Sequence, residues 1–249
     1  MSPLEVLGIL AAGFAAGGIN TIVGSGSLIT FPTLLAFGFP PVVANVSNTV
    51  GLALGAGSGV VGYRRELKGQ LRRCLTFGTA TTIGALIGGV LLLTLPSSVF
   101  AAVVPALILL ACVLIAVQPI LVGRLTREHG HGLSVIGLAG VLLTGIYGGY
   151  FGAAQGVILI ALLGIVLDDH MQRINALKNV LAGLANVVAA LLFISVTHIA
   201  WAAAGLLAVS SIVGAQVGAH YGRRIPPRVL RWTIVGVGTS VAIVLFVRG

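Results

Sequence analysis

Two short interruptions rich in small residues break long apolar runs, and they are the stretches of this sequence best suited to bind a ligand. The first reads GSGS at residues 24–27, and the second reads GAAQG at residues 152–156. Glycine lets a backbone approach a ligand closely. We expect the helical arms that begin near Ser27 and Val157 to direct their positive dipole ends and free backbone N–H groups into the centre of the protein. Two such ends would bind a small anion.

Polar side chains follow each interruption at helical spacing. Asn45 and Asn48 are three residues apart, while Asn175, Lys178 and Asn179 occupy relative positions 0, 3 and 4, so each group shares one face of a helix. A polar stripe on an apolar helix in a membrane should face the interior of the bundle or a water-filled cavity. Neutral amides there could bind the oxygens of an oxyanion, or they could hydrogen-bond between helices and orient the interruptions.

Lys178 is the one strongly basic side chain that we expect well inside a span. If its helix starts near His170, a rise of about 1.5 Å per residue places Lys178 roughly 12 Å along the helix, close to the midplane of a core about 30 Å thick. It could attract an anionic substrate. Alternatively, it could extend to the cytoplasmic interface or pair with Asp168 or Asp169. Asn186, further along the same helix, is expected to be structural.

The candidate substrate-binding residues lie in or beside the two interruptions and on the two polar stripes: Asn20, Thr21, Gly24, Ser25, Gly26, Ser27, Asn45, Asn48, Gly152, Gln155, Gly156, Asn175, Lys178 and Asn179. The alternative role for the glycines is tight helix packing, which we expect of Gly51, Gly55 and Gly59. The sequence contains no HExxH or GxSxG motif and no pair of intramembrane carboxylates, so we expect no enzyme. Cys74 and Cys112 lack the spacing of a metal or redox site, so we expect no metal or cofactor.

The elements that position these residues must be membrane helices. Of the 249 residues, 57% are hydrophobic and only 8% are charged, and the mean hydropathy is +1.12. This composition is typical of a multi-span membrane protein. The apolar runs are about 20 residues long, the length of a spanning helix, whereas a β-barrel would show short alternating segments. The net charge of +9 lies in short loops, where membrane topology explains it without a nucleic-acid partner.

The apolar runs form two halves with the same layout. In order, we expect a broken segment at 3–38, spans near 41–62, 73–94 and 98–122, a second broken segment at 133–167, and spans near 173–197, 199–220 and 230–248. The N-terminal run has no basic region before it and continues into the first interruption, so we expect it to be retained rather than cleaved as a signal peptide.

The basic residues predict the orientation of these elements. They gather in the loops at 64–73, 124–127 and 223–231, which the positive-inside rule places in the cytoplasm. The last two loops can share one side only if the second broken segment crosses the membrane an even number of times. We therefore expect that segment to enter and return as a re-entrant hairpin, or else to cross twice.

This reasoning predicts an all-α polytopic membrane protein built as an inverted repeat of two four-element halves. Residues 1–122 would form the first membrane repeat, 123–132 a cytoplasmic linker and 133–249 the second repeat. A shift of 130 residues places Gly26 on Gly156, Ser25 on Gln155, Asn45 on Asn175 and Asn48 on Lys178. Inverted repeats with paired broken helices are typical of secondary transporters, which bind their substrates near the midplane between the repeats.

The motifs of the first half carry a family resemblance. Asn20-Thr21, Gly24 to Leu28, Phe31-Pro32 and Ala44-Asn45 with Asn48 resemble the first-half signature of the sulfite exporter TauE/SafE family of membrane transporters. A weaker similarity continues through residues 148–186. The resemblance implies a small anionic substrate, sulfite or a sulfur-containing organic anion such as sulfoacetate, which is exported with protons as the candidate coupling ion.

Together these observations predict a multi-pass secondary transporter in a cell membrane of the bacterial inner-membrane type. It would move its anion by alternating access around a midplane site between two half-helix N-termini. The alternative is a passive anion channel or an accessory membrane subunit that uses the same cavity. The sequence leaves both a monomer and a homodimer open.

Overall fold

The protein is a bundle of helices, seen here in a computed structural model that describes residues 1–125, 135–221, 232, 235, 236 and 239. All regular structure in these residues is helical: α1 (Pro3–Ile22), α2 (Ser27–Ala36), α3 (Pro41–Gly62), α4 (Leu71–Thr94), α5 (Ser97–Leu125), α6 (Val135–Tyr150), α7 (Gln155–Val166), α8 (Met171–Val196) and α9 (Trp201–Tyr221). Among them, α1, α4, α5, α8 and α9 are long and apolar enough to cross a membrane. The predicted all-helical membrane fold is confirmed.

Two predicted segments fall largely beyond the described residues. They are the final span at 230–248 and the linker at 123–132. The other predicted spans correspond to helices of nearly the same bounds, and α3 coincides with the expected 41–62. The hydropathy of α3 is lowered by buried polar residues on its inward face, among them Asn45 and Asn48. A helix can carry such a face in a membrane because neighbouring helices surround it.

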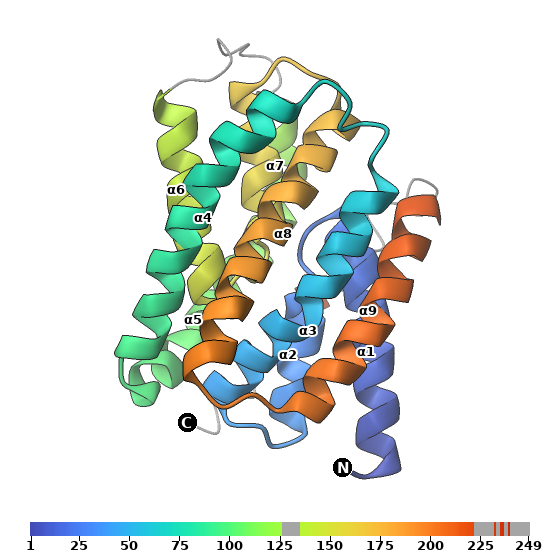
Figure 1. Cartoon of the computed structure of the whole chain (residues 1–249), viewed down its shortest axis with the longest axis vertical. Coiled ribbons are helices and arrows are strands. Elements are labelled where there is room, and N and C mark those ends of the chain that lie inside the picture. The colour runs from blue at the N-terminus through green and yellow to red at the C-terminus, as the bar shows by residue number, and fades with distance from the viewer. Residues whose placement is uncertain (126–134, 222–231, 233–234, 237–238, 240–249) are drawn as a thin grey trace.

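The two broken segments are hairpins that enter from opposite ends of the molecule (Figure 1). The first starts at the N-terminus at the lower end, bends inside the molecule between α1 and α2, and returns to the lower end before α3. The second descends from the upper end as α6, bends inside and returns upward as α7. Both bends therefore lie within the bundle, away from either end.

Local backbone chemistry explains where these hairpins begin and bend. Ser2 and Glu5 form a capping box that satisfies free N–H groups at the start of α1. Gly24 has a φ of 87°, a left-handed conformation that ends α1 and that glycine adopts without steric cost. The second bend uses Gly152 (φ 74°) and also Ala154 (φ 59°), a left-handed conformation that is rare for a residue with a side chain.

Close helix packing surrounds the hairpins. Helix α9 packs against α1 and α3, and α4 packs against α6 and α8. A Cβ atom added to Gly51 would lie 2.6 Å from Leu207 Cβ, and one added to Gly55 would overlap Ser211 on α9. One added to Gly59 would lie 2.9 Å from the Oγ1 atom of Thr21. The prediction that Gly51, Gly55 and Gly59 permit tight packing is confirmed.

An aromatic cluster ties the first hairpin to the second bend. The ring of Phe31 on α2 meets the ring of Phe151 edge to face, with centroids 5.2 Å apart. Phe100 on α5 contacts both rings and that of Tyr150. Phe31 and Phe100 are among the most deeply buried large side chains of the protein. Aromatic pairs in this geometry add stability beyond that of their buried area.

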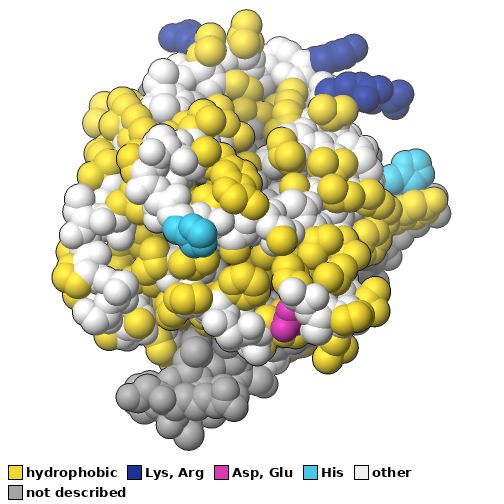
Figure 2. Space-filling model, turned by 60° about the horizontal axis from the view of Figure 1, so that its bottom comes forward, with side chains coloured by type: hydrophobic (Ala, Val, Ile, Leu, Met, Phe, Trp, Pro, Cys, Tyr) yellow, Lys and Arg dark blue, Asp and Glu magenta, His cyan; other side chains and the backbone are white. Residues whose placement is uncertain are grey.

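Charge is distributed unequally between the two ends of the bundle. The loop between α3 and α4, which carries Arg64, Arg65 and Lys68, lies at the upper end in Figure 1, as does the connection between α7 and α8. Figure 2 brings the lower end forward, and the Lys and Arg side chains visible there lie along the far upper rim. Apolar and uncharged side chains cover most of the facing surface.

Candidate functional site

The two bends meet in direct backbone contact. The N–H group of Gly156, at the start of α7, donates a hydrogen bond of 3.1 Å to the carbonyl oxygen of Gly24. A Cβ atom on Gly156 would lie only 2.5 Å from the Cα atom of Gly24, and a Cβ on Gly24 would overlap the Gly156 backbone in the same way. Both positions therefore require glycine, because the two chains could not approach this closely with side chains between them.

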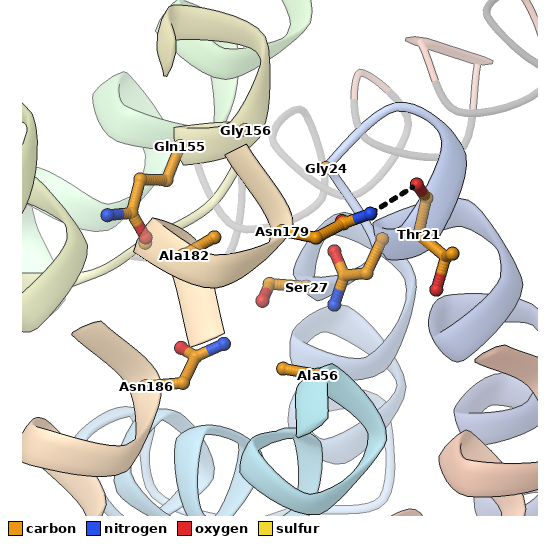
Figure 3. Close-up of a pocket in the computed structure, with 11 residues that line it drawn as sticks. Thr21, Gly24, Ser27, Ala56, Gln155, Gly156, Asn179, Ala182 and Asn186 are labelled. Carbon is orange, nitrogen blue, oxygen red and sulfur yellow. Dashed lines mark hydrogen bonds between the residues drawn. The ribbon is translucent and has the colours of Figure 1, made fainter. Parts of the chain in front are cut away.

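A small cavity lies beside this contact (Figure 3). Its volume is about 30 Å³, which is room for two or three water-sized groups at about 10–15 Å³ each. Residues from both hairpins and from two neighbouring helices line it: Asn20, Thr21, Gly24, Ser27, Ala56, Gly152, Gln155, Gly156, Asn179, Ala182 and Asn186. Figure 3 shows Ser27, Gln155, Asn179 and Asn186 around the space between the hairpins. The polar side chains of the wall are therefore the carboxamides and two hydroxyl residues, Thr21 and Ser27.

The positive ends of two half-helices face this cavity. Helix α2 begins at Ser27 as expected, whereas α7 begins at Gln155, two residues before the expected Val157. The expectation of free backbone N–H groups is wrong at both starts. The N–H group of Leu28 donates to the Ser25 carbonyl at 3.1 Å and that of Val157 to the Ala154 carbonyl at 3.0 Å. Gly26 N donates to Asn20 Oδ1 at 2.6 Å, Gln155 N donates to the Gly152 carbonyl at 3.1 Å, and Gly156 N donates to Gly24. A ligand would therefore meet the helix dipoles together with side-chain donors.

The second polar stripe lies against the carboxyl end of α1. The Nδ2 atoms of Asn175 and Asn179 each donate to the Thr21 carbonyl oxygen at 3.2 Å. The Nζ atom of Lys178 donates to the carbonyl oxygens of Asn20 at 2.8 Å and Thr21 at 3.4 Å. Helix-terminal carbonyls have no partner within their own helix, so these three side chains complete the end of α1 inside the bundle.

Lys178 does not extend to the interface, because its side chain is completely buried. Asp169, one of the two acidic partners considered for it, instead binds Arg73 and Arg173. Lys178 also lies outside the cavity lining, behind Asn20 and Thr21. Its aliphatic stem lies against the second bend, since a Cβ on Gly156 would be 3.0 Å from its Cδ atom.

The first polar stripe, on α3, makes a similar contact with the carboxyl end of α6. Asn45 on α3 donates from Nδ2 to the carbonyl oxygen of Tyr150, the last residue of α6, at 3.0 Å. Asn48 instead binds the arm that follows the first bend. Its Nδ2 donates to Ser27 Oγ at 3.2 Å, and its Oδ1 accepts a hydrogen bond from Thr30. Asn45 therefore holds the helix before the second bend, as Asn175 holds the helix before the first.

Three buried polar atoms near the bends have no hydrogen-bond partner within the described part of the chain. They are Ser25 Oγ, Asn45 Oδ1 and Asn175 Oδ1. Buried polar atoms are normally paired, and exceptions of this kind gather where water or a ligand enters or where the conformation changes. None of the three residues is part of the cavity lining.

The sequence matches one known family along nearly its whole length. The profile of a family described as sulfite exporter TauE/SafE matches residues 9–245, nearly the whole chain. The chain belongs to the TauE/SafE family. Together with the bundle of apolar helices, this membership makes it a multi-pass membrane transporter of the bacterial type.

Individual relatives of this TauE/SafE protein have names of the same kind. A probable membrane transporter protein ORF9 of Sinorhizobium sp is 27% identical, over 94% of this chain and 90% of that protein. A probable membrane transporter protein of Haemophilus influenzae is 29% identical, over 87% and 85%. The probable membrane transporter protein YfcA of Escherichia coli K12 is 26% identical, over 88% and 81%. No solved structure matches the chain significantly.

The TauE/SafE chain brings part of the predicted residue set to the cavity. Eight predicted residues line it: Asn20, Thr21, Gly24, Ser27, Gly152, Gln155, Gly156 and Asn179. Six do not line it: Ser25, Gly26, Asn45, Asn48, Asn175 and Lys178. Asn186 lines the cavity as well, although it was expected to be structural. The sequence could have indicated this position of Asn186, because it follows Asn179 by seven residues, about two helical turns, and so shares its face of the helix.

An ion-pair network joins the two halves at the upper end of the TauE/SafE bundle. Asp169, between α7 and α8, binds Arg73 at 2.5 Å and Arg173 at 2.9 Å. Arg173 also donates to the backbone carbonyls of Glu66 and Lys68 in the loop before α4. Burial alone would raise the pKa of Asp169, but the hydrogen bonds from both arginines and from the His170 N–H outweigh it and lower the pKa.

Proposed function

We propose that this TauE/SafE protein is a secondary transporter of a small anion, which binds in the cavity between the N-termini of α2 and α7. The observation that carries the proposal is the convergence of two positive half-helix ends on a cavity walled by carboxamides. No Asp or Glu is among the residues that line it. A wall of donors and dipole ends without carboxylates favours an anion over a cation.

Sulfite, or a small sulfur-containing organic anion such as sulfoacetate, is the substrate that we propose, and export is the proposed direction. The name of the family supports the sulfur chemistry. The cavity of about 30 Å³ suits the head group of such an anion, whose oxygens are each about the size of a water molecule. Amide N–H groups such as those of Gln155 and Asn179 would donate to those oxygens.

Alternating access is the proposed mechanism, with the two halves as an inverted repeat. Two observations support it. The hairpin of α1 and α2 opens to the lower end and that of α6 and α7 to the upper end (Figure 1). Asn45 and Asn175, 130 residues apart, each hold the helix before the opposite bend. Movement of one half relative to the other would expose the cavity to each side of the membrane in turn. Protons are the proposed coupling ion.

The test is transport by purified protein in sealed liposomes. Uptake of labelled sulfite and sulfoacetate would be measured with and without an imposed pH gradient, for wild type, Gln155→Ala and Asn179→Ala. Thr79→Ala, on the exposed face of α4, is the control. We expect gradient-dependent accumulation that both cavity variants lower and the control does not.

Other outcomes would decide against the proposal. Equilibration without accumulation under any gradient would identify a passive channel, because a channel cannot build a gradient. Absence of flux for every sulfur anion would overturn the proposed substrate, and equal flux in wild type and both cavity variants would overturn the proposed site.

A further inference from the structure

The carboxyl end of α1 stops inside the bundle, where its carbonyl groups carry the negative end of a helix dipole. The carbonyl oxygen of Ile19 is used by the N–H groups of Val23 and Gly24. Those of Asn20 and Thr21 face α8 and receive Lys178 and two carboxamides. A concentration of carbonyl oxygens at the end of a half-helix is the arrangement by which secondary transporters hold a coupling cation.

Lys178 places a cationic group where such an ion would bind. Its Nζ atom lies 2.8 Å from one of these carbonyl oxygens and 3.4 Å from the other, and its side chain is completely buried. Its hydrogen bonds in the described part of the chain go to these two carbonyl groups rather than to a carboxylate. A positive charge at this position would face the carbonyl groups of a helix end without a carboxylate to neutralise it, and the desolvation of such a charge is costly.

The other half shows that a bend of this kind can be built without a lysine. At the carboxyl end of α6, Asn45 donates to the Tyr150 carbonyl. The residue that matches Lys178 in the shift of 130 residues is Asn48, and it binds Ser27 and Thr30 instead of the end of α6. A buried lysine is thus present at one bend, whereas the matching position at the other holds a neutral asparagine, so a broken helix of this kind does not need the lysine to form.

We propose that Lys178 is a built-in counter-cation, a positioning residue that occupies a monovalent-cation site at the end of α1. The inference rests on the proposed function and deepens it. Lys178 holds the backbone of Asn20 and Thr21, both of which line the cavity. The side chain of Asn20 in turn accepts from Gly26 at the start of α2. The charge fixes the cavity wall and adds a positive field behind it without touching the substrate.

Replacing the tethered cation with a free one tests this inference. Truncation in Lys178→Ala empties the space of the ammonium group and its stem, so small cations should bind there. The flux of labelled sulfite would be measured in liposomes that contain choline, sodium or methylammonium chloride. The matched control is Asn175→Leu, which removes a neutral donor from the same Thr21 carbonyl and leaves the charge.

We expect wild type and Asn175→Leu to be indifferent to the cation. In choline, Lys178→Ala should show a sulfite KM raised about tenfold or more, because a positive charge that attracts the anion is lost. Methylammonium or sodium should recover at least part of that KM. A KM equal to that of wild type, or an impairment that is the same in all three salts, would overturn the inference.

A second measurement does not depend on transport. The thermal unfolding midpoint of the purified proteins would be compared in the same three salts. Methylammonium or sodium should raise the midpoint of Lys178→Ala over that in choline and should leave wild type unchanged, because a ligand that binds only the folded state stabilises it. Equal midpoints of the variant in all salts would overturn the inference. Absence of sulfite flux in the wild type would instead overturn the proposed function. The unfolding midpoints would still decide the role of Lys178 in that case.

Discussion

Substitution of Gly156 by alanine should separate the two bends. The added Cβ would lie 2.5 Å from Gly24 Cα, 3.0 Å from Lys178 Cδ and 3.1 Å from the Gly24 carbonyl oxygen. The lysine stem can move, but the Gly24 backbone cannot rotate away, so the bends must shift apart and lengthen the hydrogen bond between them. Gly164, on the same helix, is the matched control, because an added Cβ there meets no described atom within 4 Å.

The expected magnitude follows from three contributions. Overpacking a tight site costs about 1–3 kcal/mol, and weakening the hydrogen bond from Gly156 to Gly24 costs about 1 kcal/mol more. Alanine in place of glycine within a helix returns roughly 1 kcal/mol, and this gain is common to both variants. Gly156→Ala should therefore be about 2–4 kcal/mol less stable than Gly164→Ala.

Thermal unfolding of the two purified variants in one detergent measures this difference, and sulfite flux in liposomes measures its effect on function. We expect Gly156→Ala to unfold at a clearly lower temperature and to lose flux, while Gly164→Ala unfolds at or above the wild-type temperature and transports normally. Equal unfolding temperatures for the two variants would refute the reasoning, since they would show that the backbones at Gly24 and Gly156 do not constrain each other.

Three further substitutions have distinct expected outcomes. Asp169→Asn should lower the free energy of unfolding by on the order of 1 kcal/mol at neutral pH. The pKa of Asp169 is lowered in the folded state, so its stabilising contribution is present above the ordinary value near 3.9 and is lost as pH falls through the lower folded pKa. The unfolding midpoints of variant and wild type should therefore converge only in strong acid. Asn186→Leu should raise the sulfite KM and leave the unfolding midpoint nearly unchanged, because Asn186 lines the cavity; an unchanged KM would remove it from the site. Tyr147→Phe removes the hydrogen bond to the Ala153 carbonyl beside the left-handed Ala154 and should cost about 1 kcal/mol, measured by thermal unfolding; an unchanged midpoint would show that this bond does not hold the bend.

The bends were predictable from sequence because their causes are local. A glycine in the left-handed conformation at position 24 ends α1, and the arm restarts at the expected Ser27. The second arm starts two residues earlier than expected because Ala154 adopts the left-handed conformation there. Nothing in the residue type of alanine signals this, since surrounding packing imposes it.

The sequence was a weaker guide to which partner each polar side chain binds. Helical periodicity correctly placed Asn175, Lys178 and Asn179 on one face, but it could not show that this face meets the end of α1 as well as the cavity. That outcome depends on how α8 is rotated against α1, which is a property of the whole bundle. The partners of the Gly26 and Gly156 N–H groups were hidden for the same reason, because they lie in Asn20 and Gly24.

The ion-pair network at Asp169 has a consequence for the timing of any movement between the halves. Asp169 and Arg173 belong to the second half, while Arg73 and the loop carbonyls of Glu66 and Lys68 belong to the first. Under the proposed alternating access, a displacement that opens the cavity toward the upper end of Figure 1, where the basic loops lie, would first have to separate these partners. Partly exposed ion pairs weaken as dissolved salt screens them. The ionic strength on the basic side would then set how often that end of the bundle opens, independently of how tightly the cavity holds its ligand.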